Sequence, residues 1–109
     1  MKKPGVVVVW ITTPNARVSR RLAHILVEER LAACVTILDG VRSIYRWKGK
    51  VENATEQLLF AKTTRARFTA LKRRVQSLHP SRVPEIISFS LFRGHSAYLS
   101  WVADSVSKN

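Results

Sequence analysis

The sequence CVTILDGVRSIYRW at residues 34–47, followed by KG at 48–49 and KVENATEQLLFAKT at 50–63, decides the fold. β-Branched and aromatic residues dominate the first segment, as they do on the pleated, half-buried surface of a strand. Gly49 lies between two lysines and supplies the positive φ that a tight hairpin turn needs. Gly40 interrupts the first segment and indicates a β-bulge. The stretch therefore predicts one long β-hairpin.

This hairpin is too long for a compact domain of its own. At about 3.3 Å per residue, the first arm spans about 46 Å, whereas a compact chain of this length has a diameter of roughly 34 Å. The tip must therefore project from the domain or curl strongly. It carries Tyr45 and Trp47, large side chains that rarely stand in water as a pair. We predict that the tip packs on another copy of the chain.

The segment before the hairpin predicts a strand and a helix. Residues 6–12 form a continuous apolar, β-branched run, which is typical of a strand that is buried on both faces. Thr13 or Asn15 then offers a side chain that caps a helix. The apolar spacing that follows predicts that this helix runs to about Leu31.

The segment after the hairpin predicts a helix, a strand and a last helix. The first of these helices covers residues 64–78, because His79 precedes a proline and avoids the helical region. Residues 86–92 alternate as a strand, and Ser96 is expected to cap a short terminal helix. The order predicts an α+β fold of the ferredoxin-like β-α-β-β-α-β type with a C-terminal helix. The whole chain, 1–109, is expected to be one domain.

Composition limits the compartment and raises the question of a polyanionic partner. The single cysteine, Cys34, excludes an intrachain disulfide and favours a reducing compartment. No segment approaches membrane-spanning length. The 19 basic and 7 acidic residues give a net charge of +12. We interpret this charge as a solvated basic surface, with nucleic-acid or other polyanion binding as the alternative.

Any nucleic-acid binding is expected to be weak and independent of sequence. The predicted order of strands and helices also suits an RNA-recognition module, which stacks bases on aromatic residues of its third strand. The corresponding residues 48–54, KGKVENA, contain no aromatic residue. Contacts would therefore be to phosphates, and such binding falls steeply with salt.

Five motifs of the chain agree in order and spacing with a known family. They are VEERLAACV at 27–35, SIYRWKGKVE at 43–52, EQLLFAKT at 56–63, HP at 79–80 with VPEII at 83–87, and YLSW at 98–101. In these motifs the chain resembles the CutA family, the divalent-cation tolerance proteins. The resemblance covers residues 6–106 and implies a ferredoxin-like subunit in a tight homotrimer. It also implies a cytoplasmic bacterial protein linked to tolerance of copper and other divalent cations, with no established reaction. The trimeric P-II signalling proteins have a similar shape, which suggests a signalling or binding role by analogy.

The candidate metal ligands are His79, Glu85 and Cys34. Some relatives attributed with copper binding carry a cysteine and a histidine where this chain has Ile11 and Leu78, so those ligands cannot be carried over. His79 lies close to Glu85 in sequence, although it can instead cap the last helical carbonyls. Cys34 is interpreted first as a small buried side chain and second as a soft ligand. No cofactor is firmly predicted, and binding of copper or another divalent cation is expected to be weak.

The predicted interface or inter-subunit cleft contains polar and aromatic residues. Glu56 and Lys62 lie six residues apart on one face of a regular strand, where they would line a cleft or form an ion pair. No nucleophile–base motif, Gly-rich phosphate loop or HExxH stretch is present, so no enzymatic activity is predicted. The predicted set is Tyr45, Trp47, Glu56, Lys62 and Trp101.

Overall fold

The computed structural model describes residues 5–107 as a four-stranded antiparallel sheet with three helices. The strand order in the sheet is β2-β3-β1-β4, so the α+β fold and its order of elements are confirmed. The elements in chain order are β1 (Val6–Thr13), α1 (Ala16–Glu28), β2 (Cys34–Trp47), β3 (Lys50–Thr64), α2 (Arg65–Leu78), β4 (Ile86–Ser90) and α3 (Ser96–Val106).

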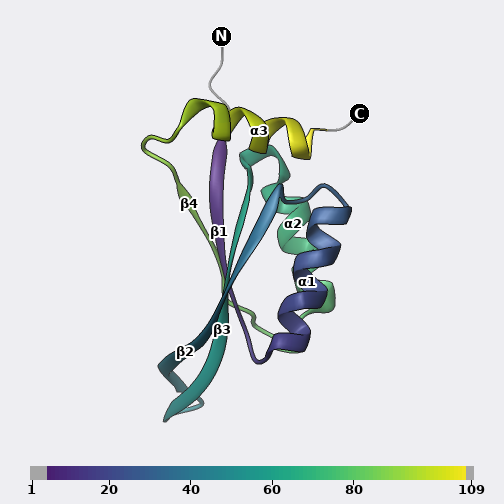
Figure 1. Cartoon of the computed structure of the whole chain (residues 1–109). Helices are drawn as coiled ribbons and strands as arrows, with labels where there is room; N and C mark the ends of the chain where they lie inside the picture. The colour runs from purple at the N-terminus through teal and green to yellow at the C-terminus, as the bar shows by residue number, and fades with distance from the viewer. Residues whose placement is uncertain (1–4, 108–109) are drawn as a thin grey trace.

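Helices α1 and α2 cover one face of the sheet, and α3 lies across the end where β1 begins (Figure 1). The main core lies between the sheet and the two covering helices. It is a fully buried apolar cluster, because each helix turns one apolar stripe toward the sheet. Its most deeply buried members are Val9, Ile11 and Leu59 of the sheet, Leu22 and Leu26 of α1, and Leu71 and Val75 of α2.

The opposite face of the sheet is not covered by any helix of the described chain (Figure 1). A row of aromatic side chains crosses it. The ring of Trp10 makes edge contacts with Phe60 at 5.4 Å and with Phe89 at 5.8 Å between centroids. This face therefore presents apolar surface on which further protein can pack.

The hairpin has the length, the bulge and the turn that the sequence predicts. Strands β2 and β3 pair from Cys34 to Trp47, with one shift of register between Leu38 and Val41. Gly40 lies in that shift with φ of 66°, and the turn has positive φ at both Lys48 and Gly49. The chain measures 50 × 26 × 22 Å. The tip of the hairpin projects beyond the helices (Figure 1).

The start of α1 agrees with the sequence, but its end does not. Asn15 is the N-cap, and its side chain accepts a hydrogen bond of 2.9 Å from the backbone N–H of Val18. The helix ends at Glu28 and not near Leu31, because Arg30 adopts a left-handed φ of 58°. The backbone N–H of Leu31 then donates to the carbonyl of Leu26 and closes the helix end.

Two boundaries near the C-terminus also differ from prediction. Helix α3 begins at Ser96 itself with His95 as its N-cap, and the cap residue makes no side-chain hydrogen bond. The prediction that Ser96 is the cap was therefore wrong. Strand β4 ends at Ser90, two residues before the predicted end, where its pairing with β1 stops. No helix within residues 5–107 is long and apolar enough to cross a membrane.

Candidate functional site

An open cleft of about 610 Å³ lies between the distal half of the hairpin and the loop that joins α2 to β4. The distal half consists of residues 41–47 and 50–56, which pair beyond the bulge. Its wall combines hydroxyl, carboxylate and apolar side chains from four segments that are distant in sequence. The lining residues are Thr12 at the end of β1, Ser43, Ile44, Tyr45 and Trp47 of β2, Glu56 of β3, and His79, Ser81, Val83, Pro84 and Glu85 of the loop.

His79 anchors the loop that forms one side of the cleft. Its Nδ1 accepts a hydrogen bond of 3.0 Å from the backbone N–H of Ser81. The proton must then be on Nε2, which donates to the carbonyl of Thr12 at 2.8 Å. The backbone of His79 is extended, as expected before a proline. Both ring nitrogens are therefore used to fix the loop to the end of β1.

The charge of the cleft has the opposite sign to the charge of the chain. Glu56, half-buried, and Glu85, exposed, both contribute to the wall. Within residues 5–107, no lysine or arginine lines it, although the chain has 19 of them and only 7 acidic residues. The hydroxyls of Thr12, Ser43 and Ser81 add neutral oxygen atoms. Such oxygen-rich surroundings suit a cation.

The apolar part of the cleft is incomplete in one chain. Tyr45 and Trp47 remain 44% and 47% exposed, and Ile44 and Val83 are more exposed still. Apolar side chains that are left open next to a polar recess are typical of a surface that another protein or a ligand covers. The sequence could not place Ser43 or Thr12 here, because only the fold brings the end of β1 next to the hairpin.

The structure brings together two of the three candidate metal ligands. His79 and Glu85 both line the cleft, whereas Cys34 lies at the other end of the sheet, beside α3. The half-buried Cys34 has its Sγ 3.4 Å from the hydroxyl oxygen of Tyr98. In the described part of the chain, no group of three or more histidine, cysteine, aspartate or glutamate residues is positioned to hold a metal ion.

The predicted interface residues fall into two places. Tyr45, Trp47 and Glu56 line the cleft. Lys62 lies on the proximal part of β3, where its Nζ donates to the hydroxyl of Thr36 and to the carbonyl of Phe60. Lys62 and Glu56 therefore do not form the ion pair that was one of the two alternatives for them.

Trp101 lies away from the cleft, on α3. Its ring stacks at a tilt on that of Tyr98, with 5.6 Å between the centroids. Trp101 is about half exposed, so it adds to the apolar surface at the end of the sheet where α3 lies. It belongs to a different surface from Tyr45 and Trp47.

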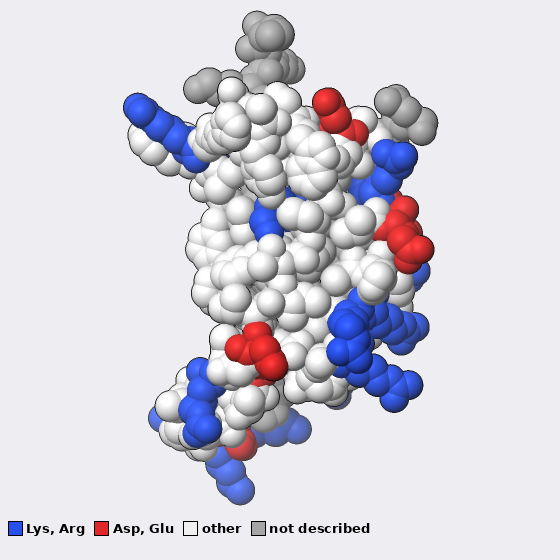
Figure 2. Space-filling view, viewed as in Figure 1, with Lys and Arg blue, Asp and Glu red and all other residues white. Residues whose placement is uncertain are grey.

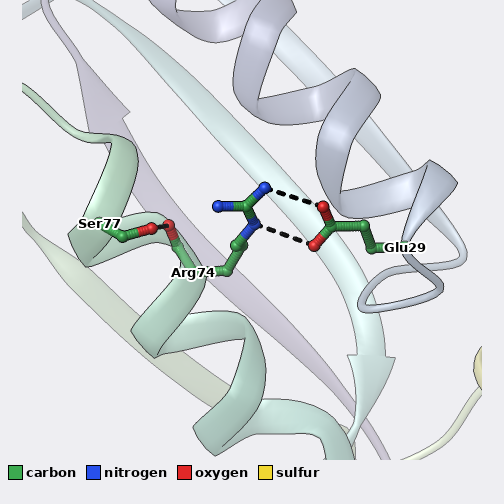
Figure 3. Close-up of polar contacts among 3 residues, drawn as sticks. All are labelled: Glu29, Arg74 and Ser77. Carbon is green, nitrogen blue, oxygen red and sulfur yellow. Dashed lines mark hydrogen bonds and ion pairs between the residues drawn. The ribbon is translucent and has the colours of Figure 1, made fainter.

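One ion pair is present within residues 5–107, and the sequence did not reveal it. The guanidinium of Arg74 on α2 donates two hydrogen bonds of 2.9 Å to the carboxylate of Glu29, just after α1 (Figure 3). The hydrogen bond from Arg74 lowers the pKa of Glu29 below its usual value. Residues 45 positions apart give no spacing signal, so only the packing of α1 on α2 shows this contact.

Comparison with known proteins shows the family to which this chain belongs. A family model described as "CutA1 divalent ion tolerance protein" matches residues 7–105. A divalent-cation tolerance protein CutA of Thermus thermophilus is 50% identical over 98 residues, covering 90% of this chain and 95% of the relative. A solved structure from Thermus thermophilus superposes with a TM-score of 0.92 at 48% identity, covering 94% of this chain and 99% of the other. The chain belongs to the CutA family.

Other relatives share the fold at lower identity and differ in length. The CutA structure from Xylella fastidiosa has a TM-score of 0.92 at 38% identity, covering 94% of this chain and 99% of the other. A CutA described as chloroplastic from Arabidopsis thaliana is 39% identical over 91% of this chain, which spans only 54% of that protein. A structure from Archaeoglobus fulgidus is described as periplasmic. The cytoplasmic location of this chain therefore stays a prediction.

Proposed function

We propose that this chain forms a homotrimer that binds a divalent cation in the cleft between subunits, as part of divalent-cation tolerance. One observation carries the proposal: in a chain of net charge +12, the cleft is lined by Glu56 and Glu85 and by no lysine or arginine of the described residues. A carboxylate-lined recess within a basic protein attracts cations locally while the remaining surface repels them. The relatives are named for divalent-cation tolerance, which agrees with this ligand.

A neighbouring subunit is needed because one chain supplies too few ligands. A tight site for a transition metal usually collects three or four ligands, and the cleft offers two carboxylates of one chain. The exposed Tyr45 and Trp47 beside them supply apolar surface for a partner. The proposal therefore places the cation where a second subunit closes the cleft.

The hydrogen bonds of His79 set the expected metal preference. Because both ring nitrogens are already bonded, His79 can coordinate Cu(II) or Zn(II) only by giving up one of its bonds to Thr12 and Ser81. Carboxylate and hydroxyl oxygens are then the first ligands, and we expect modest affinity for these metals. The proposal includes a cytoplasmic location, because a single cysteine is typical of a reducing compartment.

The assembly and the cation are tested separately. Native mass spectrometry should give particles of three chains, and a monomer at micromolar concentration would contradict the assembly. Calorimetric titration of the metal-free protein with Cu(II) and Zn(II) then compares Glu85→Gln with Glu52→Gln, a matched change on the exposed part of β3 outside the cleft. We expect Glu85→Gln to weaken binding by about tenfold or more, which corresponds to about 1.4 kcal/mol, and the control to leave it unchanged. Equal affinities for the two variants would exclude the cleft as the site.

A further inference from the structure

We propose that the chain has a second binding surface, on the helical layer, for the phosphate backbone of a duplex nucleic acid. The surface lies on the first turns of α1, and we call it the basic end. Its residues are Arg17, Arg20 and Arg21, and Arg73 of the neighbouring helix α2 adds a further exposed charge to the same helical layer. This surface accounts for part of the charge that the cation cleft does not use.

The basic end lies at the end of the sheet where β1 and α2 both end. Helix α1 starts directly after β1, with Asn15 as its N-cap. Helix α2 ends at Leu78, and the ring of His79 that follows donates to the carbonyl of Thr12 at the end of β1. The first turns of α1 and the last turns of α2 are therefore neighbours. Figure 2 shows lysine and arginine side chains gathered over the lower part of this helical side.

The arginines of the basic end point away from the core and are free to bind. Arg17, Arg20, Arg21 and Arg73 are all exposed, because the opposite sides of their helices carry the buried apolar residues. Within residues 5–107, no hydrogen bond or ion pair engages these four side chains.

Three other arginines on or beside these helices have partners, in contrast. Arg74 pairs with Glu29, Arg67 donates to the carbonyl of Val106, and Arg30 donates to that of Ser105. The acidic residues of this layer, Glu28 and Glu29, also lie at the C-terminal end of α1 and not in its first turn. The basic end thus gathers, on successive turns of one helix, three arginines that are unpaired within the described chain, whereas Arg67 and Arg74 of α2 are paired.

The positions of the free arginines are unfavourable for the helix itself. Arg17 lies in the first turn of α1, where the helix dipole disfavours a positive charge, and that turn contains no acidic residue. Arg17 also has Arg20 and Arg21 as like-charged neighbours at i+3 and i+4. Charges that destabilise the helix are therefore not explained by folding, whereas a bound polyanion would compensate them.

Arginine is also the residue that best fits phosphate. Helices α1 and α2 carry seven arginines and one lysine, namely Arg17, Arg20, Arg21, Arg65, Arg67, Arg73 and Arg74, and Lys72. The planar guanidinium can bind two phosphate oxygens at once, which an ammonium cannot. This bias favours a phosphate-bearing partner over a merely acidic one.

A duplex fits this surface better than a membrane or a single strand. The apolar stripes of both helices are used in the core, and Val27 is the one large apolar side chain of these two helices that is exposed in the described chain, so the layer has little to insert into lipid. Helix α1 has no Phe, Tyr or Trp, and the one such residue of α2, Phe68, is half-buried beside Lys72. Bases of a single strand would find no ring to stack on. The basic end also lies on the face opposite the open face of the sheet, so duplex binding and assembly can occur together.

The test compares two triple variants that lose the same charge. One carries Arg17→Gln, Arg20→Gln and Arg21→Gln at the basic end. The control carries Arg42→Gln, Arg46→Gln and Lys50→Gln on the exposed hairpin. Fluorescence anisotropy measures their affinity for a labelled duplex of mixed sequence over a series of salt concentrations.

Each lost phosphate contact should reduce the slope of log affinity against log salt by about 0.9. Raising the salt from about 50 to about 200 mM should therefore weaken the parent protein about 40-fold more than the basic-end variant, whereas the hairpin control should behave nearly as the parent does. Equal losses in the two variants, or no binding of the duplex by the parent at the lower salt, would overturn the proposal.

A competition separates a nucleic acid from a membrane. Vesicles of phosphatidylcholine and phosphatidylserine should fail to displace the duplex from the parent protein. Displacement that requires the same three arginines would reassign the surface to anionic lipid and overturn the nucleic-acid proposal. Native mass spectrometry and cation titration of both variants show whether assembly and cation binding are unchanged, so the duplex result can be judged separately from the proposed function of the cleft.

Discussion

The two halves of the β2–β3 hairpin belong to one antiparallel strand pair but differ in burial, most clearly along β3. In the base half, residues 34–38 pair with 58–62, and Leu59 is fully buried. In the distal half, residues 41–47 pair with 50–56, yet Ile44 and Val51 are 68% and 65% exposed. The two strands are paired on both sides of Gly40. From this difference we infer that the burial of a strand pair, and not its pairing alone, decides how much it contributes to stability.

Helices of the same chain cover the base half of the hairpin, whereas no helix of the described chain covers the distal half. The helices α1 and α2 pack over the base half, whereas the distal half projects beyond them (Figure 1). An isolated two-stranded hairpin is marginally stable in water. We therefore expect the base half to stabilise the fold and the distal half to stabilise contacts with other chains.

Substitution of Leu59 by alanine should have the largest effect on folding. Leu59 is fully buried in the main core, and a buried Leu→Ala change costs about 2 to 5 kcal/mol. The matched change Val51→Ala in the distal half should alter the free energy of unfolding by less than about 0.5 kcal/mol. Urea unfolding of both variants at equal concentration measures this, and similar losses would show that the halves are not distinct.

Substitution of Trp47 by alanine should weaken assembly and leave the fold of each chain intact. Trp47 is half exposed in one chain, and truncation of an aromatic residue at an interface commonly costs about 2 kcal/mol or more. We expect assembly to weaken by about 30-fold or more, while each chain keeps its secondary structure. Native mass spectrometry on dilution measures the effect, with Lys72→Ala on α2 as the control. Unchanged assembly would place the interface elsewhere.

Substitution of Gly40 tests the β-bulge that separates the two halves of the hairpin. Gly40 has φ of 66°, and an added Cβ would meet no heavy atom of the described residues within 4 Å. Gly40→Ala should therefore cost about 1 to 2 kcal/mol through backbone strain alone, seen as a shift of the denaturation midpoint. Gly40→Asn should lose less, because asparagine tolerates the left-handed region. If asparagine and alanine were equally harmful, a contact and not φ would be responsible.

The sequence predicted the bulge, the turn and the start of α1 well, because each depends on a local signal in the sequence. The turn at Gly49, the bulge at Gly40 and the helix cap at Asn15 each follow from a single residue type at a special backbone position. The ends of α1 and β4 were less predictable. Arg30 carries no sequence sign that it will adopt positive φ, and Ser90 ends a strand whose apolar alternation continues.

The candidate site was less predictable, because it depends on contacts between distant segments. The histidine–proline pair drew attention to His79, but the sequence could not show that both its ring nitrogens are used by Thr12 and Ser81. Nor could it separate Cys34 from the cleft, since only the sheet places the start of β2 and the loop after α2 at opposite ends. Glu56 does line the cleft of one chain, but the strand period that selected it also selected Lys62, which lies elsewhere.

The smallest expected effect on stability comes from the contact between Tyr98 of α3 and Cys34 at the start of β2. The contact with the thiol of Cys34, together with burial, raises the pKa of Tyr98 to about 12 from the model-compound value of 10.0. Between these values the folded chain keeps the phenol proton that the unfolded chain loses. The folded state therefore binds more protons there, and stability should fall as pH rises from about 10 to about 12.

Two variants identify this contribution among the other groups that titrate at high pH. Because more than a third of Tyr98 is exposed, solvent screening should keep the loss below about 1 kcal/mol. Tyr98→Phe should remove the corresponding part of the pH dependence of unfolding, and Cys34→Ala should reduce it by deleting its largest cause. Since the chain has only 2 tyrosines, ultraviolet absorbance in a Tyr45→Phe background follows Tyr98 alone. An ordinary phenol titration there would mean that the contact between α3 and the base half does not hold Tyr98 in solution.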